Sequence, residues 1–147
     1  MAWSFLWERY APVNWAMAYV APVFALQGLL LLFWAPAFGG AGGELRRDVG
    51  LGLFVYALAL HPLVAMIAGR PIQGAEVFAI APDPTAIATL GLVCMAQGRA
   101  AWPLMILPLL WCLASALTLY AMGAWEALIP LAAAVAAVAA RTGLDRP

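Results

Sequence analysis

Few side chains of this sequence could do chemistry within its long apolar runs, and Asp83 is the first of them. It lies between two prolines in the stretch APDPTAIATLG. Proline suits the first position of a helix and disfavours helix in the residue before it, so a helix is predicted to begin at Pro84 with Asp83 as its N-cap. We expect the carboxylate to accept a hydrogen bond from the N–H of Thr85 or Ala86. An ion or proton site at Asp83 is the functional alternative.

A second group of polar side chains precedes this aspartate. Arg70, Gln73 and Glu76 lie among apolar neighbours in the stretch RPIQGAEVFAIAPDP. We expect residues 71–83 to form a re-entrant or interfacial segment, in which the arginine pairs with Glu76 or with the aspartate at the end of the stretch. Together with His61, these side chains form a predicted polar cluster on the outer side of a membrane.

The sequence has a single histidine, His61, which is followed directly by Pro62. An imidazole can bind the metal of a tetrapyrrole such as haem or a chlorophyll, and it can also relay protons. A buried, hydrogen-bonded histidine beside a proline kink explains the same pair without any cofactor. The sequence therefore leaves the cofactor unknown, with a tetrapyrrole on His61 as one hypothesis.

The remaining polar side chains predict structure rather than catalysis. Ser115 and Thr118 share one face of an apolar segment with Trp111, a pattern typical of hydrogen bonds between helices. Cys94 and Cys112 lack metal-binding or redox spacing, so we expect two buried thiols. The sequence contains no metalloprotease motif, nucleophile elbow, phosphate loop or CxxCH haem site. We therefore predict that the protein is not an enzyme.

The composition indicates an integral membrane protein. Hydrophobic residues make up 67% of the chain and charged residues 10%, whereas soluble domains average about 45–50% and about 25%. The formal net charge is zero, which argues against nucleic acid as a partner because phosphate binding needs a basic surface. The lipid bilayer is the first partner that this composition predicts.

The apolar runs predict an all-α fold: a polytopic transmembrane helical bundle of about five membrane segments, in a single domain that covers residues 1–147. The aromatic residues 1–11 are expected to lie at the membrane interface. The third segment is short, about 21 Å at 1.5 Å per residue against a hydrocarbon core of roughly 30 Å. The alanine-rich fifth is expected to pack closely through Ala133 and Ala137. The predicted segments cover about residues 13–35, 50–69, 84–97, 101–122 and 125–141.

The arginines are shared unequally between the two sides of this predicted bundle, which bears on its orientation. Cytoplasmic loops carry an excess of arginine and lysine, and five of the seven arginines fall on one side if the N-terminus faces out. The sequence therefore predicts an N-out, C-in orientation. The inner arginines are Arg46, Arg47, Arg99, Arg141 and Arg146, and the outer ones are Arg9 and Arg70.

Three stretches resemble a family of unknown function among bacterial multi-span membrane proteins, some of them automatically labelled permeases. They are RYAPVNWAMAYVAPVFALQGLLLL, AGRPIQGAEVFAIAPDPTAIATLGL and LPLLWCLASALTLYAMGA, and the resemblance covers residues 9–141. It implies a multi-pass protein of the bacterial inner membrane. Members of that family begin with an extra helical hairpin, so the resemblance implies that this chain lacks the hairpin. It supplies no catalytic or binding residues.

Two functions fit these observations. The first is a non-enzymatic accessory or structural subunit of a larger inner-membrane complex, with other membrane proteins as partners and a pigment or haem contact through His61 as a variant. The small chain and the weakly hydrophobic alanine helix, which needs neighbours, favour it. The second is a small homo-oligomeric permease for an ion or small solute, which would use the cluster of Arg70, Glu76, Asp83 and His61.

Overall fold

The computed structural model describes residues 17–34, 43–69, 78, 81–98 and 101–143 of the 147-residue chain. All regular secondary structure in these ranges is helical, as predicted. Residues 1–11 and most of the predicted re-entrant segment lie outside the described residues. The helices are α1 (Met17–Trp34), α2 (Glu44–Val55), the π-helical segment η3 (Tyr56–Leu60), α3 (His61–Ile67), α4 (Pro82–Met95), α5 (Trp102–Ala121), the 3₁₀ turn η6 (Trp125–Ala127) and α6 (Leu128–Thr142).

Three of the described helices are long and apolar enough to cross a membrane: Glu44–Ile67, which joins α2, η3 and α3, then Trp102–Ala121 and Trp125–Thr142. The first has 24 residues, or about 36 Å at 1.5 Å per residue, which exceeds a hydrocarbon core of roughly 30 Å. The apolar stretch of α1 that qualifies by composition, Pro22–Phe33, is shorter. The all-α prediction is therefore confirmed, while the five segments and their orientation stay predictions.

The second predicted segment begins earlier than the sequence indicated. We expected this segment to start near residue 50, but α2 begins at Glu44 and includes Arg46 and Arg47. Gly43 has the extended conformation of an N-cap residue, and Glu44 places a negative charge in the first turn, where the helix dipole favours it. Hydropathy marks only the apolar part of a helix, which explains why the polar first turns were missed.

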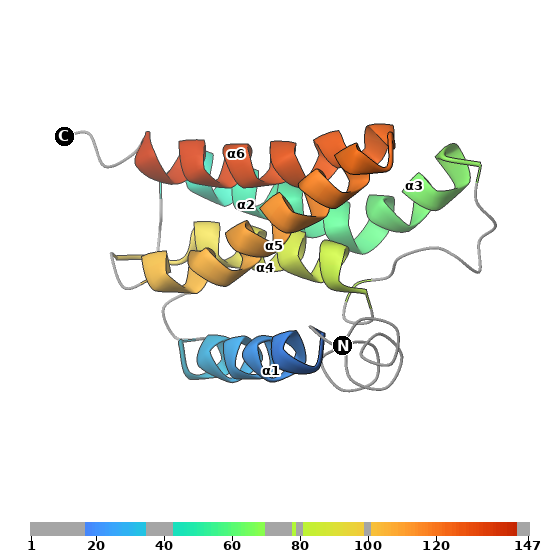
Figure 1. Ribbon diagram of the computed structural model, residues 1–147. Helices are drawn as coiled ribbons and strands as arrows, with labels where there is room; N and C mark the ends of the chain where they lie inside the picture. Colours follow the sequence, from blue (N-terminus) through green and yellow to red (C-terminus); the bar gives the residue numbers. More distant parts are fainter. Residues whose placement is uncertain (1–16, 35–42, 70–77, 79–80, 99–100, 144–147) are drawn as a thin grey trace.

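The short helix α4 lies at the centre of the bundle. Figure 1 shows α4 and α5 in the middle, with α2 and α6 on one side and α1 on the other. The helix has 14 residues, or about 21 Å at 1.5 Å per residue, as the short third segment predicted. Because protein surrounds it, α4 does not need to reach both membrane surfaces. Its buried residues are Pro84, Ala86, Ile87, Ala88, Thr89, Leu90, Gly91, Val93 and Cys94.

The backbones of α2 and α4 approach each other most closely at a pair of glycines. A Cβ atom added to Gly91 would lie 2.5 Å from the carbonyl oxygen of Gly50, and one added to Gly50 would lie 2.6 Å from the carbonyl oxygen of Gly91. Small residues at such crossings let membrane helices pack backbone to backbone. The predicted small-residue contacts of the last helix are also buried, since Ala133 and Ala137 are 5% and 0% exposed.

Arg141 of α6 holds the C-terminal end of α4. Its side chain is 1% exposed, and Nη1 donates hydrogen bonds to the carbonyls of Val93 and Ala96, both at 3.0 Å. The other terminal nitrogen donates to the carbonyl of Gly98. The last carbonyls of a helix lack partners within the helix, and the planar guanidinium offers its donors in a fixed fork. Arg141 therefore joins α6 to the end of α4.

A side chain larger than hydrogen at the glycine crossing of α2 and α4 is expected to lower the stability of the fold. Gly91→Ala should lower the free energy of unfolding by about 1–3 kcal/mol, because the added methyl group overlaps the backbone of α2. Gly52→Ala, two residues after Gly50 on α2, is the matched control: nothing lies within 4 Å of its Cβ position. Chemical unfolding in detergent measures both variants. A Gly91→Ala variant as stable as Gly52→Ala would contradict this close approach.

The contact of Arg141 with the C-terminal end of α4 leads to a second prediction. Arg141→Lys keeps the charge but cannot reach three carbonyls in the fork geometry, and hydrogen bonds from a charged group contribute about 1.5–3 kcal/mol each. We expect a loss of about 2–4 kcal/mol in the free energy of unfolding. Arg47→Lys, at an exposed position of α2, is the control and should change little. Equal stability of the two variants would show that the hydrogen bonds from the Arg141 guanidinium contribute little to the free energy of unfolding.

Candidate functional site

The carboxylate of Asp83 joins α4 to α5. Trp111 donates from Nε1 to Oδ1 at 2.7 Å, and Ser115 donates from its hydroxyl to Oδ2 at 2.5 Å. Trp111 and Ser115 are four residues apart, which places them on the same face of α5. Each oxygen of the carboxylate therefore has a donor from the neighbouring helix.

The predicted N-cap role of Asp83 is wrong. The helix begins at Pro82 with Ala81 as its N-cap, and Asp83 lies in the first turn. Proline is accepted at both early positions of the helix, since neither needs a donor there, so the second proline did not mark the start. The negative charge is still well placed near the positive end of the helix dipole.

Three threonines near these residues bond to their own helices. Thr85 donates to the carbonyl of Ala81 at 2.6 Å, and Thr89 donates to the carbonyl of Thr85 at 2.8 Å. Thr118 donates to the carbonyl of Ala114 at 2.8 Å and is exposed. Of the two hydroxyl groups predicted to bond between helices, that of Ser115 does so, through Asp83, and that of Thr118 does not.

His61 lies at the junction of η3 and α3, and its side chain is 7% exposed. The Tyr56 ring meets the imidazole edge to face, at 5.8 Å between ring centroids. Pro62 has no N–H and its ring would clash with the carbonyl four residues earlier in a regular helix. The π-helical segment just before it widens the helix at this point, as such segments often do near functional sites. The predicted disturbance at Pro62 therefore takes the form of a π-helix.

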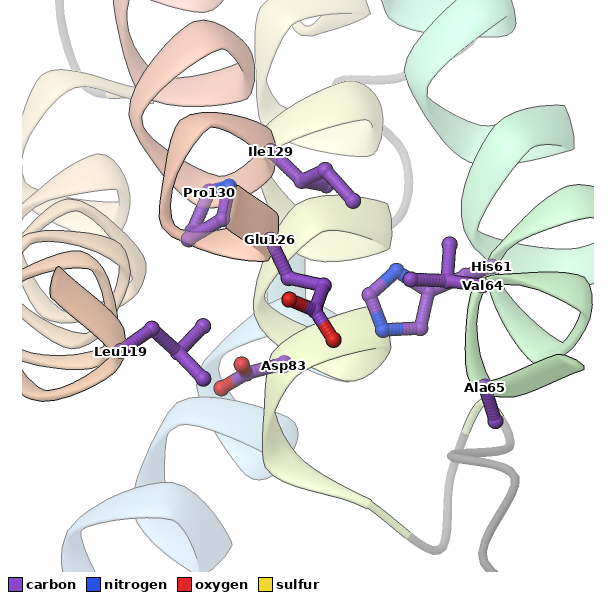
Figure 2. Close-up of a pocket in the computed structure, with 8 residues that line it drawn as sticks. All are labelled: His61, Val64, Ala65, Asp83, Leu119, Glu126, Ile129 and Pro130. Atoms are coloured by element: carbon purple, nitrogen blue, oxygen red, sulfur yellow. The ribbon is translucent and has the colours of Figure 1, made fainter. Parts of the chain in front are cut away.

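A small cavity brings His61 and Asp83 together, although 22 positions separate them in the chain. Its volume is about 20 Å³, enough for one water molecule. Figure 2 shows the Glu126 side chain extending toward the imidazole, with the Asp83 carboxylate on the same cavity. The lining residues are His61, Val64, Ala65, Asp83, Leu119, Glu126, Ile129 and Pro130.

The cavity differs in part from the polar cluster that the sequence predicted. His61 and Asp83 are both present, whereas Arg70, Gln73 and Glu76 lie outside the described residues. Sequence reasoning did not include Glu126 in the site. One signal was available in the sequence. Glu126 lies at the start of the last predicted span, and the predicted orientation places it on the same side of the membrane as Asp83.

The chemistry open to this cavity is proton exchange between carboxylates and an imidazole. Pockets for organic ligands measure about 300–1,000 Å³, so a cavity of about 20 Å³ has no room for a tetrapyrrole beside His61. Among the described residues, no group of three His, Cys, Asp or Glu side chains could hold a metal ion. The two described cysteines, Cys94 and Cys112, are buried and free, as predicted.

These features define a class: an α-helical bundle with helices that can span a membrane and with an ionisable cavity at one end. Within that class, the chain belongs to the family of unknown function DUF6064, whose model matches residues 2–145. The predicted membership of a family of unknown function is thus confirmed over nearly the whole chain. The searches of the curated proteins and of the solved structures found no match to this chain.

The bond between Ser115 and Asp83 can be tested by removing the hydroxyl. Ser115→Ala should lower the free energy of unfolding by about 1–2 kcal/mol, because a partly buried carboxylate oxygen loses a donor. Thr118→Ala is the control, since its hydroxyl bonds only within its own helix at an exposed position, and it should change stability by less than about 0.5 kcal/mol. Chemical unfolding in detergent compares them. Indistinguishable losses would argue against the interhelical bond.

Proposed function

We propose that this chain is a small, non-enzymatic membrane protein that packs against partner proteins as a subunit of an inner-membrane complex. The observation that carries the proposal is the filled centre of the bundle. Nine of the 14 residues of α4 are buried, and the cavity described above admits nothing larger than one water molecule. Such an interior supports a packing role better than the passage or turnover of an organic solute.

The outer faces of the helices support the same proposal. The helix α1 packs mainly on α5, where Gln27 donates to the carbonyl of Leu104 at 2.7 Å. This bond satisfies the one polar side chain that the apolar stretch of α1 would otherwise expose to lipid. Apart from Gln27, the α1 side chains that the structure describes are apolar, and the exposed ones can contact lipid or a neighbouring helix. Its exposed large side chains are Val23, Leu26, Leu29, Leu32 and Phe33.

We further propose the N-out, C-in orientation in a bacterial inner membrane. The two ends of the bundle differ in charge: Arg46 donates to the carbonyl of Arg141 at 3.2 Å at one end, whereas Asp83 and Glu126 line the cavity at the other. An arginine-rich end is expected to face the cytoplasm. This distribution favours the arginine end as the inner one.

A permease is the second candidate, and the cavity is the observation that favours it. Side chains of His61, Asp83 and Glu126 come from three elements and meet at one end of the bundle. Ionisable side chains within membrane proteins commonly mark ion or proton pathways. A carrier of this kind would move an ion small enough for that space, and it would work without fixed partner proteins.

Purification of the tagged protein from its native membrane in a mild detergent separates these proposals. We expect a particle much larger than the 15.6 kDa chain, with other polypeptides in fixed stoichiometry and without a visible absorption band that follows this chain. A homo-oligomer free of other polypeptides would overturn the subunit proposal. The same preparation, reconstituted in vesicles, would then show whether the protein conducts ions.

A further inference from the structure

We propose that the cavity between α3, α4 and η6 is a proton-binding site, in which His61 and Glu126 share a proton beside the fixed negative charge of Asp83. The inference goes beyond both proposed functions. It concerns what the cavity binds, and it holds equally for a subunit and for a carrier.

Asp83 supplies the fixed charge. Trp111 and Ser115 donate to both of its oxygens at 2.7 and 2.5 Å, and hydrogen bonds from neutral donors favour the ionised form of a carboxyl group. The position in the first turn of α4 favours the negative charge as well. These donors therefore hold the carboxylate in place and favour its negative charge beside the cavity.

His61 and Glu126 are the two groups that exchange the proton. The imidazole is 7% exposed, and Figure 2 shows the Glu126 carboxylate pointing toward it across the cavity. Ionised Asp83 and Glu126 would place two negative charges on one small cavity of low dielectric, where like charges repel strongly. A proton taken from bulk water forms an N–H bond on the imidazole or an O–H bond on the carboxyl group, and it removes one unit of that negative charge.

The other elements around His61 add few charged or titratable groups. Within the described part of the chain, η3 adds the Tyr56 ring, while α3, α5 and α6 line the cavity with apolar side chains. These surroundings lower the local dielectric, which strengthens the coupling between the imidazole and the two carboxyl groups. The apolar lining consists of Val64, Ala65, Leu119, Ile129 and Pro130.

The size of the cavity selects the ligand. Its volume of about 20 Å³ holds one water molecule, which needs two to four polar partners, and the lining contains three ionisable side chains. A metal ion is disfavoured, because no three potential ligands among the described residues lie close enough to hold one. A proton, alone or with one water molecule, is the ligand that fits both the space and the chemistry.

The single histidine of the chain allows a direct test by nitrogen-15 NMR of the full-length protein in nanodiscs, with a purification tag that contains no histidine. The imidazole gives one titration curve that belongs to His61 alone. We expect Glu126→Gln to change this titration curve, because the variant removes the second proton-binding group of the proposed site. Glu44→Gln neutralises an exposed acid on α2 and is expected to leave the midpoint unchanged.

A titration curve that is the same in Glu126→Gln as in the wild-type protein would overturn the shared site, since groups that share a proton titrate together. The wild-type protein provides a second measurement if this variant does not fold. Infrared difference spectra report carboxyl protonation, and a shared proton requires the carboxyl and imidazole signals to change at common midpoints. Carboxyl groups that remain ionised while His61 titrates would contradict the proposal. Neither outcome depends on whether the chain has partners or conducts ions.

Discussion

The structure depends on one constraint: the two ends of a helix that is buried along its length need polar partners other than water. The helix α4 meets this requirement differently at its two ends. At its beginning, Pro82 and Pro84 have no N–H that needs a partner, and the carboxylate of Asp83 accepts hydrogen bonds from α5. At its end, Arg141 of α6 donates to the last carbonyls. The acid and the arginine thus connect the central helix to different neighbours, and each lies where the helix dipole favours its charge.

The same constraint places opposite charges at the two ends of α4. Asp83 lies at one end, beside the cavity that Glu126 also lines. Arg141 lies at the other end, where Arg46 donates to its carbonyl and where α2 begins with both acids and arginines. Between these ends the core is apolar and built of small residues, which lets α2 approach α4 at Gly50 and Gly91. The proposed orientation and the proposed proton site therefore arise from the packing of one short helix.

Periodic and compositional features were predictable from the sequence, and contacts between distant residues were not. The apolar runs predicted the helices, and the length of the third run predicted that α4 is short. The proline spacing misplaced the start of α4, because proline is tolerated at more than one early position. No local pattern indicates that Trp111 binds Asp83 or that Glu126 joins His61. These pairs exist because helices that are distant in sequence cross at particular residues.

The position of the cavity follows from Pro62. A proline inside a helix removes one hydrogen bond and displaces the carbonyl four residues before it, and η3 accommodates this displacement with a π-helical segment. Figure 1 shows α3 continuing away from α4 beyond this point. The divergence leaves space beside the first turn of α4, and His61, the residue before the proline, lies at that space. An apolar side chain at position 61 could not bind a proton beside the carboxylate of Asp83. An imidazole in the same volume can. The backbone irregularity and the proposed chemistry thus have one cause.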